Sequence, residues 1–334
     1  MTFAILVSGG AGYIGSHVTL ALKAAGYRPV VVDDLSTGCR DLVPAGVPFI
    51  RADVGDQARM AEIFTNHDIG AVIHLAGSIV VPDSVSDPLR YYANNSAVSR
   101  NLIEIAVHFG VRAFIFSSTA AVYGDPQGER LDEAAPTRPI NPYGRSKLMT
   151  EWVLADTSAA TGLPYVALRY FNVAGADGQG RSGQASPRST HLIKLACEAV
   201  LGKRDVFTLY GDDYPTGDGT CVRDFIHVSD LADAHVLALA HLLRGGASTV
   251  INCGYGRGFS VRQVLDTVER IAGRKIPVVL AGRRDGDPAT LVSHAERIRD
   301  VLGWQPRHAD LDEIVASALA WEETGLPAIR KQAV

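Results

Sequence analysis

Short apolar segments alternate with longer stretches of helical periodicity from residue 2 to residue 172. Each apolar segment is continuous, which is typical of strands buried on both faces of a parallel sheet. These segments span residues 2–10, 27–34, 47–53, 69–77, 111–118 and 163–172. The stretches between them predict helices at residues 13–26, 57–67, 87–110 and 141–162. The alternation predicts an α/β fold with a doubly wound, Rossmann-like parallel sheet.

The composition changes after Asn172. Residues 174–190 are rich in Gly, Ser and Pro, and we expect them to form a loop. Further helices are expected near residues 189–202, 229–244, 260–272 and 311–323. We interpret this part as a smaller C-terminal α/β domain that covers the carboxyl edge of the sheet. Residues 1–171, with roughly 225–255, are expected to form the first domain, and residues 172–224 and 256–334 the second.

Composition and charge exclude several classes of protein. The chain has 334 residues, 47% hydrophobic and 20% charged, which suits a sizeable core. Its net charge of −4 provides no basic field for nucleic acid. The four cysteines lack metal-ligand spacing, so we expect reduced thiols and no metal site. No apolar run reaches transmembrane length and no signal peptide is recognisable, which predicts a cytoplasmic protein without a membrane partner.

A glycine-rich turn directly follows the first predicted strand and opens the first predicted helix. The sequence SGGAGYIGSH contains Gly9, Gly12 and Gly15 at the spacing of a phosphate-binding turn. Glycines allow the backbone to approach a pyrophosphate, and the helix start supplies free amides. A turn without a ligand is the alternative, and the surrounding strand, helix and downstream acid make it the weaker reading.

Acidic and small residues at the ends of later strands extend this pattern. Asp33 ends the second strand, where a carboxylate binds an adenosine ribose and repels a 2′-phosphate, so NAD is favoured over NADP. Asp53 ends the third strand and is placed either beside the adenine or simply in a strand-end turn. Residues 75–77, Leu-Ala-Gly, end the fourth strand with small side chains past which a cofactor could lie.

A tyrosine and a lysine four residues apart supply candidate chemistry. Tyr143 and Lys147 lie one turn apart on the predicted helix 141–162, and Thr119 directly follows the fifth strand. A hydroxyl donor followed by Tyr-x-x-x-Lys resembles the catalytic set of the short-chain dehydrogenase/reductase superfamily. A free phenol has a pKa near ~10, and shifting it to about 7 needs roughly 4 kcal/mol. We expect Lys147 and an oxidised nicotinamide ring together to supply it, so that Tyr143 acts as a base.

Longer motifs along nearly the whole chain resemble the UDP-glucose 4-epimerase family within that superfamily. They are AGYIGSH, PLRYYANN, FSSTAAVYG, NPYGRSKLMTE, LRYFNVAGA, LYGDDYPTGDGTCVRDFIHVSDLADAH and GRRDGDPA, in this order. The resemblance implies a first domain that retains NAD and a second that binds a UDP-sugar. It implies that Tyr143 deprotonates the sugar 4-hydroxyl while NAD takes the C4 hydride. The 4-keto sugar then turns over and receives the hydride on its other face.

The resemblance also implies two sets of contact residues. The cofactor set is Gly9, Gly12, Tyr13, Ile14, Gly15, Asp33, Asp53, Val54, Leu75, Ala76, Gly77, Asn94, Ser117, Tyr143, Lys147 and Tyr170. The substrate set is Thr119, Tyr143, Asn172, His191, Leu192, Tyr210, Arg223, Arg283, Asp287 and Leu291. Asn172, Arg223 and Arg283 would contact the diphosphate, because a guanidinium pairs with two phosphate oxygens. Asp287 would bind a ribose and Tyr210 would lie beside the uracil.

Related activities are less favoured. Nucleotide-sugar dehydratases and decarboxylases need a carboxyl group just after Thr119, where this chain has Ala120 and Ala121. A plain dehydrogenase must exchange its NAD, whereas this family retains it. A non-catalytic NAD-binding protein is a more remote alternative, because the catalytic set is intact.

Three departures from the family pattern bear on the substrate. Ile79 stands where many members have a lysine, and Thr190-His191-Leu192 stands where Asn-Asn-Leu is frequent. Leu291 is bulkier than the small residue expected beside an N-acetyl group. UDP-glucose and UDP-galactose are therefore expected over N-acetyl sugars, with UDP-xylose and UDP-arabinose as the alternative pair. The family also implies a homodimer formed through helices at about 88–108 and 141–160, although their apolar faces could equally be core.

Overall fold

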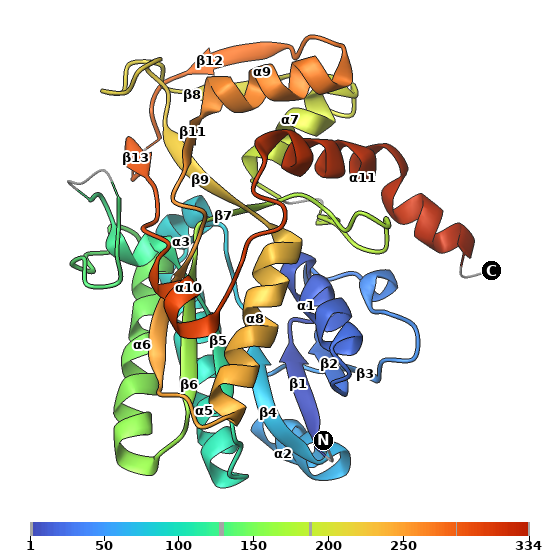
Figure 1. Ribbon diagram of the computed structural model, residues 1–334, viewed down its shortest axis with the longest axis vertical. Coiled ribbons are helices and arrows are strands. Elements are labelled where there is room, and N and C mark those ends of the chain that lie inside the picture. The colour runs from blue at the N-terminus through green and yellow to red at the C-terminus, as the bar shows by residue number, and fades with distance from the viewer. Residues whose placement is uncertain (1–2, 127–129, 187–188, 285, 333–334) are drawn as a thin grey trace.

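Seven parallel strands form the central sheet of the computed structural model, which describes residues 3–126, 130–186, 189–284 and 286–332. Their order is β10-β6-β5-β4-β1-β2-β3, and every neighbouring pair is parallel. The strands are β1 (Ala4–Ser8), β2 (Pro29–Asp33), β3 (Phe49–Arg51), β4 (Ile69–His74), β5 (Phe114–Thr119), β6 (Tyr165–Tyr170) and β10 (Thr249–Cys253). The predicted doubly wound sheet is thereby confirmed, and its first six strands lie within the predicted segments, except that β5 extends one residue further (Figure 1).

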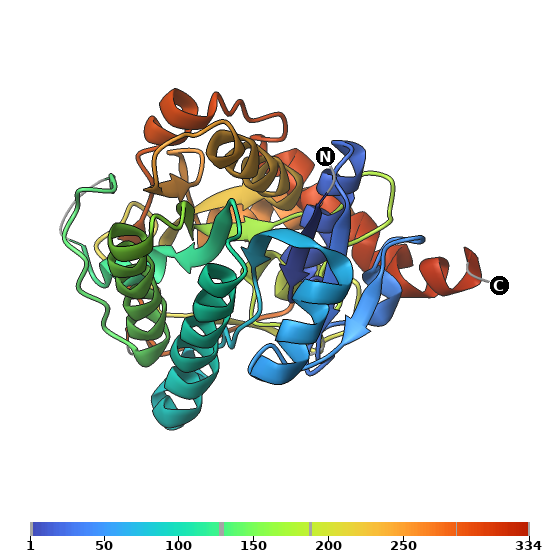
Figure 2. The ribbon, with the colours of Figure 1, turned by 90° about the horizontal axis from the view of Figure 1, so that it is seen from below.

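Helices cover both faces of this sheet, which explains why its strands read as continuous apolar runs. One face packs against α1 (Tyr13–Ala24) and α8 (Val228–Leu243). The other face packs against α2 (Gln57–His67), α5 (Val98–His108) and α6 (Pro142–Thr161). Figure 2 shows the two helical layers with the sheet between them.

The predicted helix 87–110 is confirmed with an interruption. It consists of α4 (Pro88–Tyr91), a π-helical turn η2 (Tyr92–Ala97) and α5. A π-helical turn widens the helix by one residue and so points neighbouring side chains in new directions. Here Asn94 and Asn95 both reach Ser78, on the loop after β4. The short helix α3 (Val81–Ser86) in that loop was not predicted.

A second group of elements lies over the carboxyl ends of the strands, at the top of Figure 1. It contains a mixed sheet of β7 (Asn172–Ala174), β9 (Val222–His227), β11 (Gly258–Ser260) and β13 (Thr290–Leu291), and a parallel pair of β8 (Phe207–Tyr210) and β12 (Val278–Ala281). Three helices share its core: α7 (Leu192–Val200), α9 (Val261–Ala272) and α11 (Leu311–Gln332). The described part of residues 175–190 contains no helix or strand, as expected for a loop.

Contacts between the two groups of elements are extensive. The helix α10 (Arg297–Leu302) follows β13 but packs against α8 and β10, and Ile298, Leu302 and Trp304 join the core of the central sheet. The division of the chain into two domains stays a prediction. Along the residues that the structure describes, no helix is both long enough and apolar enough to cross a membrane.

Candidate functional site

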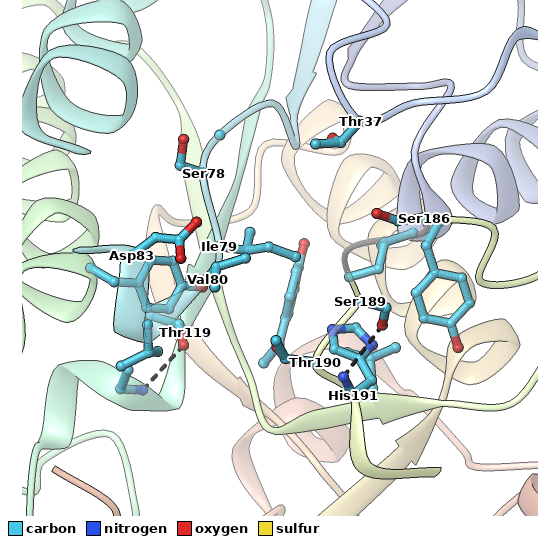
Figure 3. Close-up of a pocket in the computed structure, with 18 of the residues that line it drawn as sticks. Thr37, Ser78, Ile79, Val80, Asp83, Thr119, Ser186, Ser189, Thr190 and His191 are labelled. Carbon is cyan, nitrogen blue, oxygen red and sulfur yellow. Dashed lines mark hydrogen bonds between the residues drawn. The ribbon is translucent and has the colours of Figure 1, made fainter. Parts of the chain in front are cut away.

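A cleft of about 1410 Å³ opens at the carboxyl ends of the central strands, beneath the second group of elements. The strand order reverses between β1 and β4, which is where doubly wound sheets bind ligands. Pockets for a single small ligand usually measure roughly 300–1,000 Å³, so this cleft has room for more than one. Figure 3 shows part of its wall, with Thr119 and the loop after β4 on one side and residues 189–191 on the other.

The glycine-rich turn forms one end of the cleft. Gly9 has a φ of +72°, and its backbone lies so close to Gly15 that a Cβ there would stand 2.1 Å from the Gly9 carbonyl oxygen. The helix α1 starts at Tyr13, and no side chain caps its first amides. This cradle of exposed amides at a helix start fits the pyrophosphate of a dinucleotide.

Two aspartates lie beyond this turn at the ends of β2 and β3. The Asp33 carboxylate accepts hydrogen bonds from the amides of Ala11 (3.0 Å) and Leu35 (2.8 Å), and burial raises its pKa. Asp53 accepts a hydrogen bond from the Gly55 amide at 2.7 Å, so it does form a strand-end turn. Both side chains also line the cleft. The residues present therefore fit NAD, because the carboxylate at Asp33 is placed to bind ribose hydroxyls and would repel a 2′-phosphate.

The predicted catalytic residues come together in the same cleft. Asn141 caps α6 by accepting a hydrogen bond from the Gly144 amide at 2.8 Å, which fixes the turn that carries Tyr143. The Thr119 hydroxyl, at the end of β5, hydrogen-bonds the Tyr143 phenol. Lys147 donates from Nζ to the Ser117 carbonyl oxygen at 2.9 Å.

Burial dominates the electrostatics of this set. It raises the pKa of Tyr143, and the hydrogen bond from Thr119 only partly opposes the change. It also lowers the pKa of Lys147 to about 8. In the chain alone the phenol is therefore protonated at neutral pH. The lowered phenol pKa that we predicted depends on further positive charge from a bound ligand, because Lys147 is itself deeply buried and engaged with Ser117.

The remaining predicted residues fall almost entirely on the cleft wall. Every member of the cofactor set except Lys147 lines it, and Lys147 lies just behind, with Nζ 3.5 Å from where a Cβ on Gly77 would stand. Every member of the substrate set except Arg283 lines it as well. His191 precedes α7 as its N-cap without a capping hydrogen bond, and burial lowers its pKa to about 4. At neutral pH the imidazole is thus uncharged.

Arg283 is the one substrate residue that the structure places elsewhere. Its guanidinium donates to Asp213 (Nε to Oδ1, 2.7 Å) and stacks on the Tyr214 ring, 4.3 Å from the centroid. The neighbouring Arg284 lines the cleft instead, with its guanidinium 4.6 Å from the Tyr210 ring centroid and 2.8 Å from Asp287. The structure therefore places Arg284 rather than Arg283 on the cleft wall, and the contact of Arg283 with a diphosphate stays a prediction.

Several residues of the cleft wall were missed. Asp83 on α3 and Arg90 on α4 form an ion pair of 3.7 Å at its rim, and Ser78 lies on the loop before them. Ile79, noted above as a departure from the family pattern, is half exposed (52%) on the same loop. The signal available in the sequence was position, since this loop follows β4 at the carboxyl edge of the sheet (Figure 3).

Comparisons with known proteins show the family of this chain. Residues 5–254 match the NAD dependent epimerase/dehydratase family. A UDP-glucose 4-epimerase from Azospirillum brasilense is 57% identical, over 96% of this chain and 92% of its own. A crystal structure of UDP-glucose 4-epimerase from Brucella ovis in complex with NAD is 44% identical, with a TM-score of 0.93 over 97% of this chain and 98% of that one. A UDP-glucose-4-epimerase from Stenotrophomonas maltophila, with bound NAD and formylated UDP-arabinopyranose, is 36% identical, with a TM-score of 0.92 over 99% and 100%.

Proposed function

This chain belongs to the UDP-glucose 4-epimerases of the NAD dependent epimerase/dehydratase family, and we propose that its cleft interconverts UDP-galactose and UDP-glucose with NAD as a retained cofactor. The observation that carries the proposal is the convergence of Thr119, Tyr143 and Lys147 on a cleft that begins at a glycine-rich helix start. The first two residues reach a reacting hydroxyl, and the helix start holds the dinucleotide beside it.

Each member of the catalytic set has a distinct task. NAD supplies the redox chemistry, because it can accept a hydride from C4 of the sugar and return it to the opposite face. Tyr143 takes the proton of the 4-hydroxyl as general base and returns it as general acid in the second half of the reaction. Thr119 holds the sugar oxygen and the phenol in register through its hydroxyl. Lys147 favours the phenolate by its positive charge and is held in place by the Ser117 carbonyl.

The UDP part of the substrate would lie beneath the second group of elements. Arg223 on β9 and Arg284 would contact the diphosphate, and Asn172 on β7 would donate from its amide. The Arg223 guanidinium is 3.9 Å from the Asp287 carboxylate, so the two are arranged for neighbouring phosphate and ribose groups. Tyr210 at the end of β8 would stack beside the uracil.

Sequence at the end of β5 argues against dehydration and decarboxylation. Thr119 is followed by Ala120 and Ala121, which begin the short helix η3 (Ala120–Tyr123) and line the cleft. Methyl groups there cannot exchange protons with a 4-keto sugar, so the intermediate can only be reduced again.

The sugar preference stays a proposal. Leu291 lines the cleft at β13, and its side chain would leave less room for an N-acetyl group than a small residue, so we infer a preference for UDP-glucose and UDP-galactose. The pentose pair is a second candidate, because a sugar without C6 would meet no obstacle there.

One assay tests the activity and the preference together. The purified protein, without added NAD, is given UDP-galactose, UDP-N-acetylgalactosamine or UDP-arabinose, and the products are identified by NMR. We expect UDP-glucose from UDP-galactose at the highest rate. Failure to convert any of the three would contradict the proposed function, and equal rates for UDP-galactose and UDP-N-acetylgalactosamine would contradict the role of Leu291.

Location and assembly are further parts of the proposal. We propose a cytoplasmic location, and we infer a homodimer from the apolar side chains that α4 and α6 expose together. Leu89, Met149 and Trp152 are 80%, 41% and 58% exposed, which is unusual for large apolar side chains on neighbouring helices.

A further inference from the structure

A buried ion pair lies next to the proposed catalytic set. Glu151 on α6 and Arg169 on β6 are each only 5% exposed. The guanidinium binds the carboxylate through two bonds, Nη2 to Oε2 at 2.7 Å and Nε to Oε1 at 3.0 Å. Two charges removed from water are costly unless geometry and further hydrogen bonds compensate, so such a pair calls for an explanation.

The pair is connected directly to the strand end that holds the catalytic residues. The Ser118 hydroxyl donates to Glu151. Ser118 lies between Ser117, whose carbonyl binds Lys147, and Thr119, whose hydroxyl binds Tyr143. Glu151 therefore ties the last residues of β5 to the helix that carries both catalytic side chains.

The other side of the pair is equally anchored. Arg169 donates from Nη1 to the Tyr123 hydroxyl at 2.9 Å. Tyr123 in turn donates to the side-chain oxygen of Asn252 on β10 at 2.7 Å, and Asn252 donates to the Leu131 carbonyl at 2.8 Å. A network in which each polar group is satisfied is rigid, and rigidity is what a catalytic geometry requires.

On the basis of the proposed function, we propose that Glu151 and Arg169 are positioning residues for proton transfer by Tyr143. They act in two ways. Their two-bond ion pair fixes α6 against β5 and β6, which sets the distance between Thr119 and the phenol. Their mutual neutralisation also leaves the positive charge of Lys147 to act on the phenol without an opposing carboxylate.

Other titratable groups surround the phenol and the pair. Tyr143 lies one helical turn before Lys147 on α6 and interacts electrostatically with Tyr91 on α4 and Tyr170 on β6. Two further groups are Asp83 on α3, which acts on Tyr91, and His74 on β4, whose pKa is lowered to about 3 by burial and, to a smaller extent, by the charge of Lys147.

The ion pair has neighbours of its own. Tyr123 interacts electrostatically with Arg169, and Tyr165 interacts with both Glu151 and Arg169. Glu133 in turn acts on Tyr123. None of these groups changes in the variants below, so a difference between variants reports on the pair itself.

The charge argument gives a signature that a purely structural role does not. Glu151 follows Tyr143 by eight residues, which is about 12 Å along a helix. At an effective dielectric constant near 20, one uncompensated charge at that distance shifts a pKa by about one unit. Glu151→Gln leaves the Arg169 cation, which favours the phenolate. Arg169→Met leaves the Glu151 carboxylate, which disfavours it.

The test is the pH dependence of kcat for UDP-galactose in the purified, NAD-containing protein. We expect the acid limb to move down by up to about one pH unit in Glu151→Gln and up by a similar amount in Arg169→Met. Arg169→Lys keeps the positive charge but loses the two-bond geometry of the guanidinium. We therefore expect kcat to fall about 10-fold, while the pH of its acid limb stays the same and KM changes little. Glu322→Gln is the matched control, because Glu322 forms a comparably buried pair with Lys194 between α11 and α7. It should leave both quantities unchanged.

Bound NAD and the circular dichroism spectrum establish that each variant is folded. Should Arg169→Met fail to fold, Glu151→Gln and Arg169→Lys still decide the matter. Folded, NAD-loaded variants with the wild-type kcat and acid limb would overturn the inference. So would acid limbs that move in the same direction in Glu151→Gln and Arg169→Met. An active wild-type protein with unaffected variants overturns the inference alone, whereas an inactive wild-type protein overturns the proposed function on which it depends.

Discussion

At the scale of single residues, the burial of Lys147 shows that the fold loses stability in order to hold a cation at the site. Lys147 is only 2% exposed, and its ammonium group donates to the Ser117 carbonyl and lies 5.0 Å from the centroid of the Phe116 ring. Burial lowers its pKa from 10.5 to about 8. A cation kept in such a place reduces stability, which is typical of a residue retained for chemistry.

Replacement of Lys147 by Met should reveal this cost as a pH dependence. The fold lowers the Lys147 pKa, so the unfolded chain binds more protons between about pH 8 and 10.5, and the stability of the wild-type protein rises with pH across that window. Relative to Lys147→Met, the free energy of unfolding of the wild-type protein should gain about 2 kcal/mol between pH 7.5 and pH 10. Urea unfolding of both proteins at the two pH values measures the difference. If the difference in the free energy of unfolding between the two proteins does not change with pH, the pKa of Lys147 is not lowered by the fold.

At the scale of elements, the first strand, turn and helix act as one unit. The backbone of Gly9 lies against Ala76 at the end of β4 and against Gly15 in α1, so the turn joins two strands and a helix at one point. The same close approach leaves the helix start open for a pyrophosphate.

Gly15→Ala should therefore remove cofactor binding together with stability. The new Cβ would lie 2.1 Å from the Gly9 carbonyl oxygen, which forces the helix away from the turn and costs at least about 2 kcal/mol. We expect the purified variant to contain less than about a tenth of the wild-type amount of NAD. Gly178→Ala is the control, because no atom lies within 4 Å of its Cβ position. Wild-type NAD content in Gly15→Ala would contradict the assignment of the turn.

The sequence predicts the elements of the site better than the direction of its side chains. The six strands and the helix carrying Tyr143 and Lys147 follow from apolar runs and from i, i+4 spacing, which depend on local chemistry. The placement of Arg284 rather than Arg283 on the cleft wall goes with contacts that are distant in sequence, because Asp213 and Tyr214 bind the Arg283 side chain. The π-helical turn that aims Asn95 at Ser78 is likewise invisible in the periodicity.

At the scale of the whole molecule, the cleft is built from two groups of elements that share cores. The segments 172–174 and 222–227 pair as β7 and β9. The chain continues from β9 directly into α8, which packs on the central sheet. The resemblance to the UDP-glucose 4-epimerases, first inferred from motifs, is confirmed by relatives and structures that cover nearly the whole chain. The proposed dimer uses the outer surface of α4 and α6, where these two helices expose apolar side chains.

A charge placed on that flank should separate the proposed dimer. Trp152→Glu puts a carboxylate at a position that is 58% exposed in the single chain and would be buried between two copies. Light scattering should find a mass of two chains for the wild-type protein and of one chain for the variant. Val279→Glu, on the 50% exposed strand β12, is the control and should stay dimeric. A wild-type protein with the mass of one chain would contradict the proposal.

The account depends most on the phenol of Tyr143 as the proton carrier beside a retained dinucleotide. The most direct measurement is the rate at which Tyr143→Phe, carrying the wild-type amount of NAD, converts UDP-galactose to UDP-glucose. The variant keeps the ring and loses one hydroxyl, so we predict a rate at least about 100-fold below that of the wild-type protein. Conversion at the wild-type rate would contradict the mechanism.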